Sequence, residues 1–352
     1  MSIIFAILIF SLLIFVHELG HFLTAKASGV QVNEFAIFMG PAIWKKQIGE
    51  TLYSIRLIPL GGYCAMEGED EDTDNPRSFQ KAVWWKRLVI LVAGAAMNLI
   101  VGILLLAIVL SPMTHENVLK VDSFESWSTL DDNGLQVGDE ILSIDGEKMY
   151  VFGDFSMMLS LNPGQNHDLV IERDGKKLQL DDFLMETHEV TLEDGTKTQM
   201  YGVTFTQQEL TFGGKVKLVI HTTLDWIRSV RLSLSMLLSG EASFSQVSGP
   251  VGIVSQMSDV AAASPTWVDA LLNMLYFGAY IAVNLAVMNL LPIPALDGGR
   301  VFALLITTAI QAITRKEIDP KYEGYIHGAG MILLLGLMAL IMFKDIFAIF
   351  TR

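Results

Sequence analysis

Three stretches of the chain contain no Asp, Glu, Lys or Arg over a length that can cross a lipid bilayer: Leu88–Leu110, Ala270–Leu296 and Ile326–Phe343. Because an α-helix rises about 1.5 Å per residue, roughly 20 apolar residues cover the hydrocarbon core. A fourth apolar stretch runs from Ile3 to about Ala25 and is interrupted by ionisable side chains. The four stretches predict a polytopic α-helical membrane protein with four transmembrane helices.

Two of the apolar stretches have a second interpretation. The N-terminal one could be a signal peptide, but no basic region precedes it and no small-residue cleavage pattern follows it. Val301–Thr314 is also uncharged, yet its 14 residues are better suited to a re-entrant or buried helix than to a crossing.

Charge is distributed unevenly along the chain. Residues 112–270 carry 24 Asp and Glu against 10 Lys and Arg, whereas the remaining residues balance at 14 against 14. The net charge of −14 disfavours nucleic acid as a partner. A single cysteine excludes an intramolecular disulfide framework and a multi-cysteine metal cluster. The acidic block therefore has a different character from the membrane-spanning part of the chain.

Basic residues in the short loops predict the orientation in the membrane. Residues 26–87 carry eight Lys and Arg, and the loop before the last span carries Arg300, Arg315, Lys316 and Lys321. Because such loops face the cytoplasm, both termini and the acidic block are expected outside. The expected location is the bacterial cytoplasmic (inner) membrane.

The first span contains the sequence His17-Glu18-Leu19-Gly20-His21. Ionisable residues within a span are costly and indicate function. Residues one helical turn apart lie on one face, so His17 and His21 can share one metal ion, and Glu18 is placed to act on a water at that ion. The motif predicts a zinc site and is not typical of a buried core histidine.

A catalytic zinc ion takes three protein ligands, so a third ligand is required. Asp297 is the first residue after the 27-residue uncharged run. Pro292 and Pro294 break the helix shortly before it. Gly298 and Gly299 allow a close backbone approach. From the residues alone, Asp297 is either a ligand or the cap of the following helix. His327 could also reach the site, although an interfacial role suits it better.

Residues 42–62 read as two strands around Gly49-Glu50. Open strand edges cannot face lipid, so this hairpin must pack on protein or pair with an extended segment. A transmembrane substrate has to unwind before cleavage, and a free edge could bind it by β-addition. The alternative is that the hairpin only plugs the helix bundle.

Residues 114–207 alternate short strands with Asp-Gly turns, with a short helix near Asp154–Leu161. The run Gly138-Asp-Glu-Ile-Leu-Ser-Ile-Asp-Gly146 resembles a PDZ domain, which implies a groove for an extended ligand or a bulky gate. Val216–Leu238 is amphipathic and is expected to lie on the outer membrane surface or to pack under this domain.

Taken together, the motifs resemble the site-2 proteases, which are intramembrane zinc metalloproteases, and within them the bacterial RseP/RasP type. The resemblance covers nearly the whole chain. It includes the first-span motif, Leu296-Asp297-Gly298, Phe38–Pro41 and Ile58–Tyr63 at the edges of a membrane re-entrant β-hairpin, Ala93-Gly94 to Asn98, and Ser248–Ile253. That type usually has two tandem PDZ domains, whereas the length here leaves room for one.

The resemblance implies one Zn²⁺ ion per chain, held by His17, His21 and Asp297, with Glu18 as the catalytic residue. It places Asn289 beside the site as a ligand of the substrate backbone, and we assign Pro292 and Pro294 to substrate binding as well. The implied activity is cleavage of transmembrane segments, in single-pass proteins or signal-peptide remnants, on the cytoplasmic side of the bilayer. The alternatives are a catalytically silent scaffold that bears a PDZ domain and a metal transporter.

The expected organisation has four regions. Residues 1–111 hold the first two spans and the re-entrant hairpin, and 112–207 form the extracytoplasmic PDZ-like α+β domain. Residues 208–269 are an amphipathic helix and linker, and 270–352 hold the last two spans.

Overall fold

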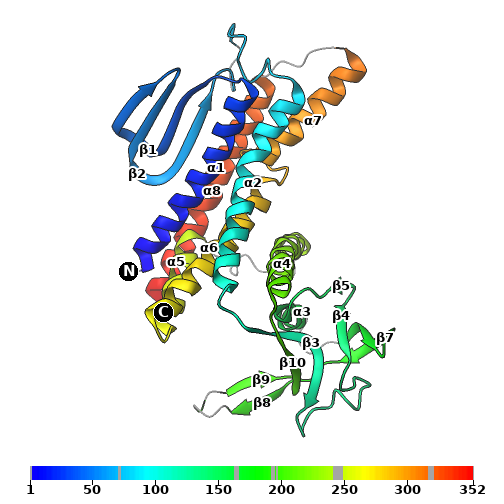
Figure 1. The fold of residues 1–352 in the computed structure, drawn as a ribbon. Helices are drawn as coiled ribbons and strands as arrows, with labels where there is room; N and C mark the ends of the chain where they lie inside the picture. Colours follow the sequence, from blue (N-terminus) through cyan, green and yellow to red (C-terminus); the bar gives the residue numbers. More distant parts are fainter. Residues whose placement is uncertain are drawn as a thin grey trace. The chain divides into compact units, whose positions relative to one another are not determined.

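The computed structural model describes residues 2–69, 73–161, 166–191, 195, 197–240, 249–315 and 321–351. The chain divides into two compact units (Figure 1). Unit 1 comprises Met1–Val109 and Trp226–Arg352, and unit 2 comprises Leu110–Asp225.

Unit 1 contains four helices that are long and apolar enough to cross a membrane. They are α1 (Ser2–Ser28), α2 (Trp84–Leu110), α6 (Trp267–Asn289) and α8 (Lys321–Thr351). The sequence prediction of four spans is therefore confirmed for the described residues. Apolar side chains remain exposed along α8, such as Ile332 and Leu333, as expected for a helix that faces lipid rather than water.

The third span ends earlier than the uncharged run that predicted it. The run continues to Leu296, but α6 ends at Asn289. Pro292 and Pro294 cannot donate backbone hydrogen bonds, so the chain turns before it enters α7 (Asp297–Thr314). Ala295 in this turn has a φ of +80°, which is an uncommon conformation for a residue with a side chain.

Strands β1 (Val32–Ile48) and β2 (Thr51–Met66) form the predicted hairpin, which is longer than the expected residues 42–62. Gly49 at the turn has a φ of +61°, a conformation that glycine adopts without strain. The first part of β1 pairs with two different parts of β2, one on each side. Phe35, for example, is opposite Tyr53 on one side and opposite Cys64 on the other. Gly62–Met66 thereby forms one edge of the sheet.

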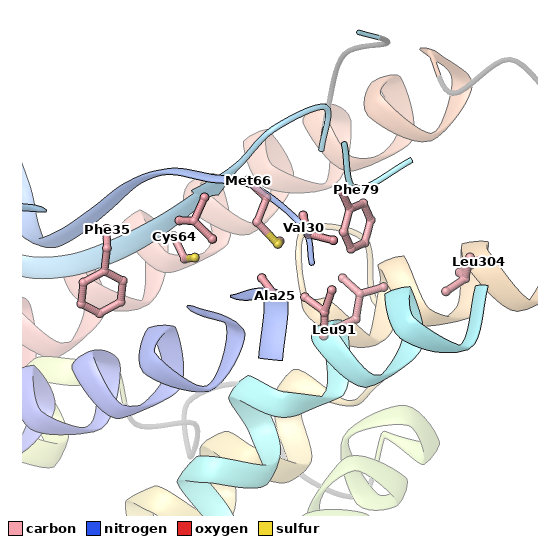
Figure 2. Close-up of a cluster of buried hydrophobic side chains, with 10 residues drawn as sticks. Ala25, Val30, Phe35, Cys64, Met66, Phe79, Leu91 and Leu304 are labelled. Carbon is pink, nitrogen blue, oxygen red and sulfur yellow. The ribbon is translucent and has the colours of Figure 1, made fainter. Parts of the chain in front are cut away.

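A cluster of buried side chains fixes the hairpin to the helices. Figure 2 shows Phe35, Cys64 and Met66 from the hairpin beside Ala25 of α1 and Leu91 of α2. Close packing of such side chains stabilises the arrangement through many small van der Waals contacts. The base of the hairpin is therefore packed against α1 and α2, whereas Pro41–Gly49 around its turn are exposed.

Glycines allow the spans to approach closely. A Cβ atom on Gly20 of α1 would lie 2.4 Å from the carbonyl oxygen of Ala93 in α2. A Cβ on Gly102 of α2 would lie 2.8 Å from a methyl group of Val283 in α6. Small residues at these crossings bring helix backbones together, as in other membrane bundles.

Unit 2 is built on an antiparallel sheet of order β10-β3-β4-β6-β7, with β5 paired to β4 and a separate β8-β9 pair. Helix α3 (Phe152–Leu161) packs with β3. The predicted Asp-Gly turns are present, since Asp145-Gly146 and Asp174-Gly175 all have positive φ. The strands are β3 (His115–Phe124), β4 (Glu140–Ile144), β5 (Glu147–Lys148), β6 (Asn166–Arg173), β7 (Lys176–Leu184), β8 (His188–Thr191), β9 (Lys197–Met200) and β10 (Val203–Glu209).

Two further helices lie within the region expected to be an amphipathic helix and linker. Helix α4 (Phe212–Ser239) corresponds to the predicted amphipathic segment. Helix α5 (Pro250–Ala263) was not predicted, and it packs against α1, α6 and α8. Ile253, Val254, Met257 and Val260 follow a helical repeat, which the interpretation of residues 208–269 as one amphipathic helix and a linker did not use. Ser248, the start of one segment that resembles the site-2 proteases, lies outside the described residues.

Candidate metal centre

His17 and His21 lie on one face of α1, as their spacing predicts. Their Nε2 atoms are 3.2 Å apart. The His21 side chain is buried and that of His17 is half-buried. Two imidazole nitrogens this close, away from bulk water, form a pair of adjacent ligand atoms.

Asp297, the first residue of α7, brings a carboxylate to the same point. Its Oδ2 atom lies 3.1 Å from Nε2 of His17 and 3.3 Å from Nε2 of His21. Among the described residues, these three side chains form a group whose ligand atoms all lie within 4.8 Å of one another. The Asp297 side chain therefore faces the two histidines.

The turn between α6 and α7 delivers this carboxylate. A Cβ atom on Gly298 would lie 2.3 Å from the carbonyl oxygen of Leu291, and one on Gly299 would lie 2.3 Å from that of Ile293. Neither position can hold a side chain without moving the backbone. The Asp-Gly-Gly sequence is thus required by close packing of the turn.

The geometry fits a bound cation. Oδ2 of Asp297 is buried and has no hydrogen-bond partner among the described residues, although two ring nitrogens lie near it. Lone pairs facing one another are unfavourable unless a proton or a cation lies between them. A Cβ atom on Gly94 would lie 2.4 Å from Nε2 of His21 and 2.8 Å from that of His17, so α2 keeps this space free. Two imidazoles and one carboxylate are a ligand set that suits Zn²⁺.

Glu18 lies beside the three candidate ligands without joining their group. The backbone N–H of Cys64 lies near its carboxylate. A Cβ atom on Gly62 would lie 3.5 Å from Cγ of Glu18. The Gly62–Met66 edge of the hairpin therefore runs alongside Glu18.

The other predicted site residues are grouped around the α6–α7 turn. Nδ2 of Asn289 lies 3.4 Å from Nδ1 of His17. Pro292 is exposed, and Pro294 packs so closely on α8 that a Cβ on Gly330 would lie 2.4 Å from its Cβ. His327 is not part of the ligand group, since its Nδ1 accepts a hydrogen bond from the backbone N–H of Ala295.

Helix α2 contributes three positions to which the sequence reasoning gave no role. The carbonyl oxygen of Ile90 is 2.8 Å from Nδ1 of His21, and Nδ2 of Asn98 is 3.4 Å from Nδ1 of His17. Gly94 lies between them. The sequence did hold a signal for this role, because Asn98 is a single Asn in the uncharged span Leu88–Leu110 and follows Gly94 by four residues.

Comparisons with known proteins all point to one family and cover nearly the whole chain. Residues 5–337 match the model of peptidase family M50. A protein of Clostridium perfringens, named as a candidate zinc metalloprotease, is 38% identical over 349 residues and 98% of both chains. Two proteins are 27% identical: the zinc metalloprotease RasP of Geobacillus kaustophilus (98% of this chain, 97% of the relative) and the regulator of sigma-W protease RasP of Bacillus subtilis (99% of both). The chain therefore belongs to peptidase family M50, the site-2 protease family, and is a metalloendopeptidase.

Proposed function

We propose that this protein is a zinc-dependent endopeptidase that cleaves transmembrane segments, with one zinc ion held by His17, His21 and Asp297. The convergence of three ligand atoms on one point, with Asp297 Oδ2 buried and without a hydrogen-bond partner, carries the proposal. Zinc bound there would polarise the scissile carbonyl and make a water molecule more acidic. Because His17 and His21 belong to a candidate membrane span, the cleavage site would lie within the bilayer.

Glu18 is the proposed catalytic base and acid. Its carboxylate accepts a proton from the attacking water and then delivers that proton to the leaving amine. The backbone of Gly62 and Cys64 lies beside this carboxylate and limits the positions that it can adopt. The hairpin thus helps to position the proton carrier.

The hairpin is the proposed binding site for an unwound substrate. A helical transmembrane segment has its peptide groups occupied in internal hydrogen bonds, so it must become extended before attack. The edge formed by Gly62–Met66 lies beside Glu18 and could pair with such a segment by β-addition. The half-buried amide of Asn289 could bind the substrate backbone, and Pro292 and Pro294 would shape the adjoining wall. In this proposal the hairpin enters the membrane from the cytoplasmic side.

Unit 2 is the proposed extracytoplasmic PDZ-like domain. Its antiparallel sheet, the helix α3 and the two Asp-Gly turns support that interpretation. The domain could bind an extended end of a partner or limit access to the active site. The proposed regions are 1–111, 112–207, 208–269 and 270–352, with both termini outside and α4 at the outer membrane surface. Single-pass proteins and signal-peptide remnants are the proposed substrates.

The variant Glu18→Gln tests this mechanism. It keeps the shape of the side chain but removes its basicity, so we expect turnover of a helical membrane peptide in detergent to fall by at least about 100-fold. The zinc content should stay near one ion per chain. Chelation of the wild-type protein should abolish activity, and added zinc should restore it.

The variant Glu140→Gln is the matched control, because Glu140 is an exposed residue of unit 2. It should keep wild-type turnover. Undiminished cleavage by Glu18→Gln would overturn the role of Glu18, and a wild-type protein that binds no zinc would overturn the metal site. Membership of a metalloendopeptidase family supports the protease over the scaffold and the transporter.

A further inference from the structure

We propose that α2 orients both zinc-binding imidazoles and that Asn98 is the positioning residue for His17. Its amide oxygen accepts the Nδ1–H of His17, which leaves the lone pair of Nε2 directed toward the metal ion. This inference rests on the proposed zinc site and assigns a role to a residue outside the ligand set.

The hydrogen bond of His21 shows how α2 acts on its ring. Nδ1 of His21 lies 2.8 Å from the carbonyl oxygen of Ile90. A carbonyl oxygen only accepts, so Nδ1 carries the proton and Nε2 of the neutral ring is left unprotonated. Metal-binding histidines generally donate their second N–H to such an acceptor, which fixes both the tautomer and the ring orientation.

His17 requires the same kind of acceptor, and two amides are near its Nδ1. The nitrogens of Asn98 and Asn289 each lie 3.4 Å from this atom. A ring nitrogen can make one hydrogen bond in the ring plane, so the two amides cannot both be its partner. A hydrogen bond donated to Nδ1 would put the ring proton on Nε2 and prevent metal binding through that atom.

Burial distinguishes the two amides. Asn98 is 1% exposed, and its Oδ1 has no hydrogen-bond partner among the described residues. A half-turn of the amide about its Cβ–Cγ bond exchanges Oδ1 and Nδ2, so that the oxygen accepts the His17 N–H and the amide nitrogen takes the former position of Oδ1. Asn289 is only half-buried, so it remains available for a substrate.

The residues of α2 that contact the two imidazoles have the same four-residue spacing as the histidines on α1. Ile90, Gly94 and Asn98 follow one another at intervals of four residues, so they share one face of the helix. This face meets His21 and His17, which are also four residues apart, on α1. Between the two acceptors, Gly94 leaves room for the ring edges. One helix thus supplies the ligands and its neighbour supplies the acceptors that orient them.

The test compares zinc affinity in full-length variants purified in detergent, measured by competition with a chromophoric chelator. Asn98→Leu and Asn98→Ala remove the acceptor and should lower zinc affinity about 10–100-fold. Asn98→Asp retains an acceptor and should bind zinc within roughly threefold of the wild type. The visible absorption of bound Co²⁺ should change in the Leu and Ala variants and persist in the Asp variant.

Two control variants separate this role from neighbouring ones. Asn289→Leu should keep wild-type zinc affinity and lose peptide binding, seen as a raised KM. Asn284→Leu removes an amide of α6 that donates to the carbonyl of its own helix at Tyr280, and it should leave zinc affinity unchanged. The thermal midpoint of each chelated variant reports whether the fold survives.

The inference is overturned if Asn98→Ala binds zinc as tightly as the wild type, or if Asn98→Asp loses as much affinity as Asn98→Ala. It is also overturned if Asn289→Leu, and not the Asn98 variants, loses zinc. A wild-type protein without zinc affinity would instead refute the proposed function, which makes the two failures distinguishable.

Discussion

At the scale of single residues, glycine and three polar side chains define the candidate centre. His17, His21 and Asp297 bring their ligand atoms together only because the surrounding backbones leave space for them. Gly298 and Gly299 let the turn fold tightly, and Gly94 lets α2 lie against the imidazoles. A methyl group at Gly94 would occupy the space of the ring nitrogens, and one at Gly298 or Gly299 would collide with the backbone of the turn that carries Asp297.

Gly94→Ala is therefore expected to lower zinc affinity by more than about 100-fold, since its Cβ would lie within 3 Å of both Nε2 atoms. Gly336→Ala in α8 is the matched control, because a Cβ there meets nothing within 4 Å. It should bind zinc normally and unfold at the same temperature or a slightly higher one. Metal content after dialysis checks both, and normal zinc binding by Gly94→Ala would show that the helices can separate at this point.

At the scale of elements, the hairpin is held in shape by a polar network. Arg56 donates to Glu34 at 2.7 Å and to the Gly40 carbonyl at 2.6 Å, and its guanidinium lies 5.1 Å from the centre of the Tyr63 ring. Burial and the hydrogen bond to Glu34 raise the pKa of Tyr63 to about 12, so its hydroxyl stays protonated. Ser54 also donates to Glu34. The network joins both strands close to the proposed substrate edge.

Arg56→Met should loosen the hairpin without removing zinc. It leaves Glu34 without its cation, so amide hydrogen exchange in residues 32–66 should accelerate roughly tenfold. Peptide cleavage should fall while metal content stays constant. Lys45→Met, an exposed change on β1, should alter neither. Unchanged exchange in Arg56→Met would mean that backbone pairing alone holds the hairpin.

At the scale of the whole molecule, each unit has its own core. Residues of unit 1 bury apolar side chains between the spans and the hairpin, whereas Leu130, Ile144 and Leu169 are among those buried in unit 2. Within unit 2, Arg173 makes two hydrogen bonds of 2.7 Å to the buried Asp139 carboxylate. Separate cores allow the membrane part and the acidic part to carry distinct functions.

The chain has a single cysteine, Cys64, so one substitution gives a background in which an introduced cysteine reports the side of the membrane on which it lies. In a Cys64→Ala background, Lys177→Cys in unit 2 should react with a membrane-impermeant maleimide in intact cells. Lys81→Cys, in the loop before α2, should react only after the cells are opened. Both lysines are exposed, and the eight Lys and Arg of residues 26–87, which the rule counts without regard to acidic residues, predict the sidedness. The reverse labelling pattern would invert the proposed topology.

Much of the architecture can be read from consecutive residues. Uncharged runs identify the spans, and the positions of His17 and His21 on one face follow from the helical repeat alone. The Asp-Gly turns and the hairpin are equally local features. Helix α5 was missed although Ile253, Val254 and Met257 recur at helical spacing, because residues 208–269 were interpreted as one amphipathic helix and a linker. The end of α6 before Asp297 was predicted from Pro292 and Pro294, since the uncharged run by itself does not mark where a helix stops.

The sequence by itself thus determined the four spans, the two histidines with Glu18 between them, and a short set of partners for them. Only the tertiary structure shows which of those side chains lie at the histidines: the carboxylate of Asp297 and the amide of Asn98 do, whereas Nδ1 of His327 accepts a hydrogen bond from the backbone of Ala295. The physical reason is that helical periodicity depends on neighbouring residues, whereas a three-ligand site depends on how closely distant backbones can pack. Here the glycines of α1, α2 and the α6–α7 turn set those distances.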